Sequence, residues 1–159
     1  MNHRVFLGLG SNLGEPRRNI LRAVDLLREQ SQCEAAQLSP LYVTPPMGGV
    51  TQPDFINAAL EIYTPLAPLD LLEICKAIEQ DMGREQSVRW GPRLIDIDIL
   101  LYADRIIDEP NLSIPHIGLG ERSFVLYPLA DLDSQLVIPG SGPINQLKSA
   151  LKDTEIRPL

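Results

Sequence analysis

The amino-acid sequence predicts an α+β fold, in which an antiparallel β-sheet carries helices on both faces and helical additions follow at the C-terminal end. Apolar patterns of strand and helix type follow one another in a defined order, and prolines open both early helical patterns. The composition agrees, because 159 residues with 44% hydrophobic and 22% charged side chains suffice for one domain, residues 1–159, with a substantial core.

The first half of the chain predicts three strands and one helix. These are a strand over Arg4–Gly10, a helix from Pro16 to Glu29, and strands over Ala35–Thr44 and Phe55–Tyr63. The helix is indicated by apolar residues at helical spacing, namely Ile20, Leu21, Val24 and Leu27. The second strand is expected to stop at two prolines, which cannot donate hydrogen bonds to a sheet.

The second half begins with a helix from Pro68, which Gly83 is expected to end. Its apolar stripe consists of Leu71, Leu72, Cys75, Ile78 and Met82. A strand over Leu94–Tyr102, a short strand at Ile106-Ile107, and helices near Arg122–Leu132 and over Pro143–Leu151 should follow. The order strand, helix, strand, strand, helix, strand with C-terminal additions is the ferredoxin-like βαββαβ plan.

Charge and cysteine content narrow the functional classes. The net charge of −7 opposes binding to a long nucleic-acid backbone but allows a small polyphosphate, whose surroundings a metal and a few arginines can make positive. Cys33 and Cys75 lack metal-ligand spacing, and no apolar run approaches the roughly 20 residues of a membrane span. We therefore expect a cytoplasmic protein, monomeric, without nucleic-acid or membrane partners.

The most informative stretch is a strand with two carboxylates. Side chains two apart on a strand point the same way, so Asp96 and Asp98 should share one face, roughly 7 Å apart. Ile95, Ile97, Ile99 and Leu101 should fill the other face. Neighbouring carboxylates repel each other, and Mg²⁺ prefers oxygen ligands, so the pair is a candidate magnesium site. The simpler alternative is that both aspartates only face water.

Cations and rings surround this pair in the sequence. Arg84, Arg89 and Arg93 offer planar donor forks that suit phosphate, and Trp90 offers a flat apolar surface. Further candidates are Asn57 within an apolar strand, His116 in a loop, and Arg122 with Phe124. The structural alternatives are that the arginines pair with the aspartates, that Trp90 packs in the core, and that Asn57 bonds to backbone.

Three other functions fit parts of this pattern. Gly8, Gly10 and Gly14 resemble a dinucleotide-binding fingerprint, but the spacing is one residue too long and no βαβα alternation follows. A metal-dependent nucleotidyltransferase would also use paired aspartates. A noncatalytic RNA-binding sheet would need exposed aromatics and basic surroundings, which the acidic balance disfavours.

Short motifs that fit one pattern lie nearly from end to end of the chain. They are Gly10-Ser11-Asn12-Leu13, Tyr42–Gly48, Gln52–Ala59, Ile78-Glu79, Gly83-Arg84, Arg89–Asp98, Pro115-His116, Arg122, Phe124 and Pro128-Leu129. Together these motifs resemble the 6-hydroxymethyl-7,8-dihydropterin pyrophosphokinases of folate biosynthesis.

The resemblance implies a reaction, its cofactors and its site residues. The β,γ-pyrophosphoryl group of ATP would pass to the pterin hydroxymethyl oxygen with release of AMP, and Asp96 and Asp98 would hold two Mg²⁺ ions. The residues implied to bind the pterin are Thr44, Pro46, Phe55, Asn57, Trp90 and Phe124. Those implied to bind ATP are Glu79, Arg84, Trp90, Arg93, His116 and Arg122, and Arg84 and Arg93 would act in catalysis beside the aspartates.

Some positions depart from the family pattern. The stretch from Arg84 to Trp90 is one residue shorter than in the family pattern and carries no lysine. A loop cation that contacts phosphate in the family therefore has no lysine counterpart here. Phe55 stands where tyrosine is familiar, which keeps ring stacking and removes a hydroxyl. Lys76, Asn111 and Ile117 also differ, and none of these changes alters the implied reaction class.

Overall fold

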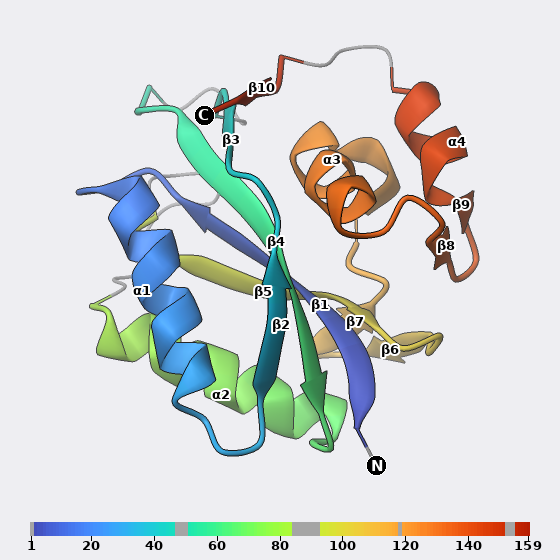
Figure 1. Ribbon diagram of the computed structural model, residues 1–159, viewed down its shortest axis with the longest axis horizontal. Coiled ribbons are helices and arrows are strands. Elements are labelled where there is room, and N and C mark those ends of the chain that lie inside the picture. Colours follow the sequence, from blue (N-terminus) through green and yellow to red (C-terminus); the bar gives the residue numbers. More distant parts are fainter. Residues whose placement is uncertain (1, 47–50, 84–92, 118, 152–154) are drawn as a thin grey trace.

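A computed structural model of the chain describes residues 2–46, 51–83, 93–117, 119–151 and 155–159 (Figure 1). The helices are α1 (Pro16–Arg28), α2 (Pro68–Asp81), α3 (Ser123–Leu132) and α4 (Ile144–Ser149), with a 3-10 turn η1 (Leu119–Glu121). The strands are β1 (His3–Ser11), β2 (Glu34–Leu38), β3 (Tyr42–Thr44), β4 (Phe55–Thr64), β5 (Asp96–Tyr102), β6 (Ile107–Glu109), β7 (Leu112–Ile114), β8 (Val137–Ile138), β9 (Gly142–Pro143) and β10 (Arg157–Pro158). Within these described residues, no helix has the length and apolarity needed to cross a membrane.

The main sheet has six strands in the order β10-β3-β4-β1-β5, with β2 also paired to β4. Every strand pair in the described residues is antiparallel. This arrangement excludes the dinucleotide-binding fold considered from the glycine spacing, because that fold needs parallel strands. β1 pairs with β4 on one edge and β5 on the other, so it aligns both of these strands.

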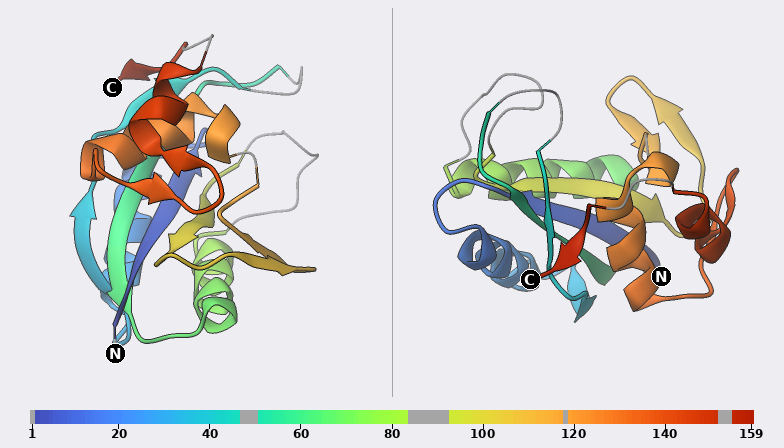
Figure 2. Two further views of the ribbon diagram at one scale, coloured as in Figure 1. Left: turned by 90° about the vertical axis from the view of Figure 1, so that its right-hand side faces the viewer. Right: turned by 90° about the horizontal axis from the view of Figure 1, so that it is seen from above.

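Helices cover both faces of the sheet, as the sequence predicted. Val5, Leu7 and Leu9 of β1 point into a cluster with the buried sides of α1 and α2, whereas Phe6 points into a second cluster with α3 and α4. In Figure 2, α3 and α4 lie next to each other and away from α2. Strand alternation therefore assigns odd residues of β1 to the large core and even ones to the opposite face.

Both early helices were predicted correctly, except for one core residue. The buried side of α1 consists of Ile20, Ala23, Val24 and Leu27, whereas Leu21 is 41% exposed. Leu21 follows Ile20 directly, and this one-residue step turns its side chain toward the edge of the apolar stripe. α2 ends where predicted, and Gly83 adopts a φ of 87°, a left-handed conformation that glycine tolerates best.

The predicted strand over Ala35–Thr44 is in fact two strands, β2 and β3, that both pair with β4. The break falls at Ser39-Pro40, where proline has no N–H to donate. Ser39 compensates, because its N–H donates to the Ala59 carbonyl (2.8 Å) and its hydroxyl accepts the Ala59 N–H (2.9 Å). A side chain thus replaces one backbone acceptor across the break.

A β-bulge in β5 corrects the prediction for Leu101. The register passes from Phe6↔Leu101 to Leu7↔Ile99, which leaves Leu100 as an extra residue. Beyond this point the alternation is reversed, so Leu101 packs in the cluster with α3 instead of the large core. Ile95, Ile97 and Ile99 lie in the large core as predicted.

After β5 the chain forms more short strands than the sequence predicted. Of the expected Ile106-Ile107 strand, only Ile107 is in a strand, as the first residue of β6, which forms a hairpin with β7. β8 and β9 form another hairpin. β10 adds an edge strand beside β3, with its Arg157 Nη2 3.2 Å from Asp54 Oδ2. Such short strands carry little apolar periodicity, so their sequence signal is weak.

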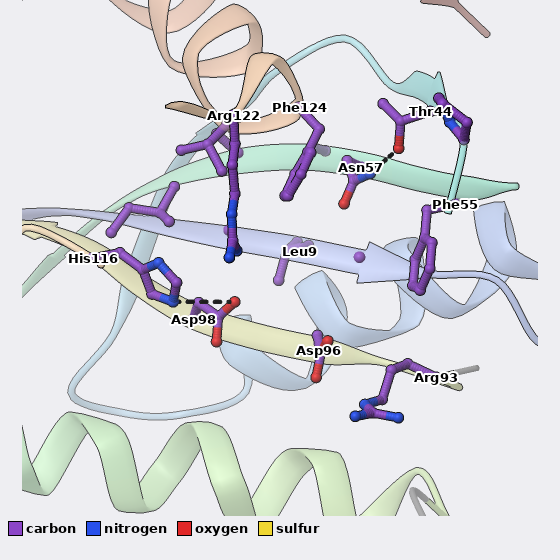
Figure 3. A pocket seen from close by; sticks show the side chains of 17 residues that line it. Leu9, Thr44, Phe55, Asn57, Arg93, Asp96, Asp98, His116, Arg122 and Phe124 are labelled. Atoms are coloured by element: carbon purple, nitrogen blue, oxygen red, sulfur yellow. Dashed lines mark hydrogen bonds and ion pairs between the residues drawn. The ribbon is translucent and has the colours of Figure 1, made fainter. Parts of the chain in front are cut away.

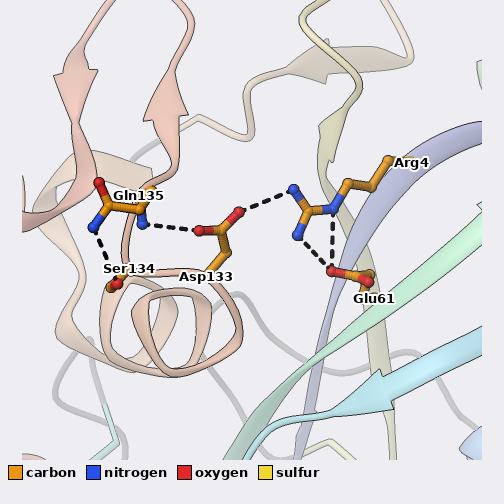
Figure 4. A network of polar contacts seen from close by, with 5 residues as sticks. All are labelled: Arg4, Glu61, Asp133, Ser134 and Gln135. Atoms are coloured by element: carbon orange, nitrogen blue, oxygen red, sulfur yellow. Dashed lines mark hydrogen bonds and ion pairs between the residues drawn. The ribbon is translucent and has the colours of Figure 1, made fainter.

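Arg4 connects the sheet to the end of α3 (Figure 4). Its guanidinium donates to Glu61 Oε2 from Nε (3.1 Å) and Nη2 (2.7 Å), and to Asp133 Oδ2 from Nη1 (3.0 Å). The backbone N–H of Gln135 bonds to Asp133 Oδ1 at 2.8 Å. This N–H first, and Arg4 in addition, lower the pKa of the Asp133 carboxyl, which burial alone would raise.

We expect Asp133→Asn to lower the free energy of unfolding by about 1 kcal/mol at neutral pH, because Arg4 loses a charged acceptor. The folded-state pKa of Asp133 lies below its unfolded value. Its contribution is therefore present above the unfolded pKa and is lost as pH falls through the folded one. Urea denaturation over the acid range should show the two proteins converging, while exposed Asp108→Asn stays close to wild type throughout. A constant gap down to acid pH would contradict this account.

Candidate functional site

A pocket of about 280 Å³ lies over the middle of the sheet, beside the start of α3 (Figure 3). Its walls come from β1, β3, β4 and β5 and from the segments that lead into β5 and α3. The lining residues are Gly8, Leu9, Gly10, Thr44, Pro45, Phe55, Asn57, Ala58, Ala59, Arg93, Asp96, Asp98, Leu100, His116, Arg122, Phe124 and Val125.

One side of the pocket combines two aromatic rings with an amide. In Figure 3, Phe55 of β4 and Phe124 of α3 lie on either side of Asn57. The Asn57 side chain is nearly buried, and its Nδ2 donates to Thr44 Oγ1 at 2.7 Å. The amide therefore bonds to a side chain on the neighbouring strand β3, not to backbone as the structural alternative held. A flat, hydrogen-bonding molecule suits such a site.

The other side carries the two aspartates. Asp96 and Asp98 both line the pocket from β5, as strand alternation predicted, and the Asp98 side chain is 51% exposed. His116 Nε2 lies 3.8 Å from Asp98 Oδ2. The backbone N–H of His116 donates to the carbonyl of Leu100 (3.0 Å), the extra residue of the β5 bulge. The bulge thus helps to hold His116 beside Asp98.

Asn12 holds the segment that leads into β5. Its N–H donates to the Arg93 carbonyl (3.0 Å), and its Oδ1 accepts the Arg93 N–H (2.8 Å). Its Nδ2 donates to Gln52 Oε1 (2.8 Å) and to the Pro53 carbonyl (2.9 Å), just before β4. Buried Asn12 therefore joins the two segments that bring Phe55 and Arg93 to the pocket.

The role of Asn12 was not predicted from the sequence, although its motif was noted. A signal was available, because an amide directly after a buried strand must find several partners. The small residues of the pocket floor, Gly8 and Gly10, were predicted only as part of the first strand and of glycine-containing motifs. Their position opposite functional residues becomes visible only in the strand register.

Two arginines balance the two carboxylates that line the pocket. Arg93 lines it near Asp96, and Arg122 lines it where α3 begins (Figure 3). Arg122 Cζ also lies 5.6 Å from the centre of the Phe124 ring. Among the described residues, the Nδ1 atom of His116 is buried without a hydrogen-bond partner. Despite the net charge of −7, the pocket thus presents donors to an anion.

Most of the predicted site residues come together in this pocket. Those that line it are Thr44, Phe55, Asn57, Arg93, Asp96, Asp98, His116, Arg122 and Phe124. Pro46 is half-buried outside the lining, where its neighbour Pro45 takes part instead. Arg84, Arg89 and Trp90 lie outside the residues that the structure describes.

Glu79 faces the strand of the aspartates and does not line the pocket. Its side chain on α2 is buried, and its Oε2 accepts the backbone N–H of Ile97 at 2.7 Å. Ile97 stands between Asp96 and Asp98. A buried carboxylate that accepts this N–H holds β5 in place beneath the two aspartates. In this arrangement Glu79 supports the site from behind.

The donor atoms of the pocket suit a magnesium ion that is shared with phosphate. Among the described residues, no group of three or more His, Cys, Asp or Glu side chains could hold a metal by itself. Mg²⁺, however, commonly binds one or two carboxylates together with water and the phosphates of a substrate. The partly exposed pair of Asp96 and Asp98 fits this second kind of site.

An antiparallel sheet with a carboxylate pair, arginines and a two-ring cleft suits an enzyme that transfers a phosphate-containing group. Comparison with known proteins specifies the class. Residues 6–134 match the model of the family described as 7,8-dihydro-6-hydroxymethylpterin-pyrophosphokinase (HPPK), and the chain belongs to this family. It is accordingly a pyrophosphokinase, a type of transferase.

Individual relatives agree along nearly the whole chain. A protein of Pseudomonas aeruginosa named 2-amino-4-hydroxy-6-hydroxymethyldihydropteridine pyrophosphokinase is 44% identical over 150 residues, covering 94% of this chain and 93% of the relative. A protein of the same name from Haemophilus influenzae is 38% identical over 149 residues, with the same two coverages of 94% and 93%.

A solved structure shows the same fold in a longer chain. HPPK-DHPS of Plasmodium falciparum superposes with a TM-score of 0.75 at 18% sequence identity. The superposition covers 94% of this chain but 45% of that one. At this identity the likeness concerns the fold alone.

We expect Glu79→Ala to lower the free energy of unfolding by about 1–3 kcal/mol, because the N–H of Ile97 loses its acceptor in a buried place. Glu79→Gln retains an acceptor oxygen and should recover much of this loss. Urea denaturation measures the effect, and hydrogen exchange at the Ile97 amide should be faster in the alanine variant only. Equal exchange at Ile97 in all three proteins would show that this bond does not hold β5.

Proposed function

We propose that the chain transfers the β,γ-pyrophosphoryl group of ATP to the hydroxymethyl oxygen of 6-hydroxymethyl-7,8-dihydropterin, in folate biosynthesis and with Mg²⁺. AMP is the second product. The observation that carries this proposal is that a ring-and-amide cleft and a carboxylate pair line the same pocket, on two strands that flank β1. A planar acceptor and a phosphate-rich donor can therefore meet over one strand.

The acceptor binds on the side of β3 and β4. Phe55 and Phe124 stack on the pterin ring, and Asn57 and Thr44 supply hydrogen bonds to its edge. Because both polar side chains are nearly buried, a ring without matching polar atoms would leave them unpaired. By resemblance to the family, Pro46 and Trp90 complete this side.

The donor binds on the side of β5. Arg93 and Arg122 bind phosphate oxygens, and His116 donates a further hydrogen bond. When bound to Asp96 and Asp98, two Mg²⁺ ions supply positive charge to the triphosphate and lower the pKa of the attacking hydroxyl. By resemblance, Arg84 and Trp90 contribute from outside the described residues. Glu79, which the resemblance implied as an ATP-binding residue, serves the ATP side through its hydrogen bond to β5.

Alignment and charge neutralisation carry most of the catalysis. A primary alcohol is a weak nucleophile, so its oxygen must be held in line with the β-phosphorus while AMP leaves. The ring cleft fixes the alcohol, and Arg84 with Arg93 stabilises the charge that develops on the phosphoryl oxygens. None of the described residues stands out as a general base, since the carboxylates nearest the site are those assigned to the metal.

Several wider properties belong to the same proposal. The strand order supports classing the sheet as ferredoxin-like, with β2 and β3 acting together as one strand of the βαββαβ plan. Cys33 and Cys75 are free and buried, which suits a reducing compartment such as the cytoplasm. We propose one domain that acts as a monomer on small molecules.

We expect incubation with ATP, Mg²⁺ and 6-hydroxymethyl-7,8-dihydropterin to release AMP in step with the pterin diphosphate. Chromatography of the nucleotides measures this directly, with samples lacking the pterin as the control. Release of pyrophosphate would instead support the nucleotidyltransferase alternative, which uses the same carboxylates. Retention of RNA on filters would favour the noncatalytic alternative, although the two aspartates that line the pocket speak against it.

We expect Asp98→Ala to lower turnover by about 10³-fold or more, because a metal ligand beside the reacting phosphate is lost. Asp98→Asn keeps the size of the side chain but removes its charge, so turnover should fall by a similar factor. Exposed Asp104→Ala is the matched control, and rates of AMP formation at saturating substrates are compared. Near-normal turnover of both Asp98 variants would refute the metal assignment.

A further inference from the structure

We infer that Gly10 is a specificity-determining residue of this pocket, because its missing side chain leaves the space in which the Asn57 amide stands. The inference rests on the proposed function, since it concerns how the planar acceptor is recognised. It adds a positioning role for a residue that the sequence indicated only as the end of a strand and the start of a family motif.

The contact between the two residues follows from the sheet register. Gly10 of β1 lies directly opposite Asn57 of β4, on the face that lines the pocket. A Cβ atom built on Gly10 would lie 2.7 Å from Asn57 Oδ1, a separation that real Cβ atoms essentially never show. Any larger residue at this position must therefore displace the amide.

Backbone conformation does not explain this glycine. Gly14, Gly83, Gly140 and Gly142 have positive φ angles, whereas Gly10 does not. An alanine could thus adopt the backbone conformation of Gly10 within β1 without strain. The requirement for glycine is one of space above the strand.

The amide has little freedom to give way. Asn57 is 9% exposed and Thr44 is 4% exposed, and the 2.7 Å hydrogen bond between their side chains fixes the amide plane. Rotation of Asn57 away from a methyl group at position 10 would break this bond. It would also leave two buried polar groups unpaired. The methyl group therefore acts on acceptor recognition through Asn57.

Gly8, the other glycine of β1, has different neighbours. A Cβ on Gly8 would lie 3.1 Å from the side chain of Leu100, whose apolar end can shift. The atoms nearest a Cβ on Gly10 belong to Asn57 and Ile56, not to the carboxylate of Asp96 across the other edge. A substitution at Gly10 should therefore impair the acceptor side and spare the donor side.

The first experiment compares Gly10→Ala with Gly120→Ala, a matched control whose added Cβ would lie more than 4 Å from every heavy atom of the described residues other than its chain neighbours. We expect Gly10→Ala to raise the KM for the hydroxymethyl-dihydropterin about tenfold or more, as for a lost hydrogen bond with its partners left unpaired. The KM for ATP should stay within about twofold, and Gly120→Ala should behave like wild type. A normal pterin KM in Gly10→Ala would overturn the inference.

A double variant tests whether Asn57 mediates the effect. Asn57→Ala vacates the space that the methyl group needs, so Gly10→Ala should add little further loss in that background. If Gly10→Ala alone fails to fold, the double variant should recover folding for the same reason. Independent losses that multiply, or a double variant that stays unfolded, would overturn the inference.

A measurement without substrate separates this inference from the proposed function. In ¹⁵N-labelled protein, the side-chain amide signal of Asn57 is identified by its disappearance in Asn57→Ala. It should shift in Gly10→Ala and stay in place in Gly120→Ala, whether or not the wild type forms AMP. An unshifted signal in Gly10→Ala would refute the role of Gly10, whereas absent AMP formation would refute only the proposed function.

Discussion

The pairing of β1 with both β4 and β5 is the constraint on which the rest of the site depends. Gly10 lies opposite Asn57 on one edge and Asp96 on the other, and Gly8 lies opposite Ala59 and Asp98 in the same way. Because side chains alternate along a strand, a slip of one residue would turn the amide or the carboxylates into the core. The register of one strand thus sets the distance between the acceptor and donor sides.

Hydrogen bonds from buried polar side chains to the backbone help to keep the strands in this register. Asn12 bonds to the backbone just before both β4 and β5, and Glu79 bonds to the middle of β5 from α2. Breaking either set of hydrogen bonds is unfavourable, because it would leave polar groups unpaired in buried places. Residues that do not touch a substrate therefore determine where Phe55, Arg93 and the aspartates stand.

The second layer of helices closes the pocket from above. α3 begins at Ser123, and the residues on either side of it, Arg122 and Phe124, line the site. The far end of α3 is joined to the sheet through Asp133 and Arg4. The cluster of α3 with Phe6, Leu100 and Leu101 holds the helix against the strands between these two ends. The β5 bulge contributes twice, since it turns Leu101 into this cluster and offers the Leu100 carbonyl to His116.

Local patterns in the sequence were sufficient for α1, α2, the shared face of Asp96 and Asp98, and the family to which the chain belongs. These features depend on periodicity and on motifs of neighbouring residues, which a linear sequence contains in full. The division of β2 from β3, the bulge at Leu100, the support of β5 by Glu79 and the space above Gly10 required the folded chain. Each depends on contacts between segments far apart in the sequence, and their register and spacing are decided only when the strands pair and pack.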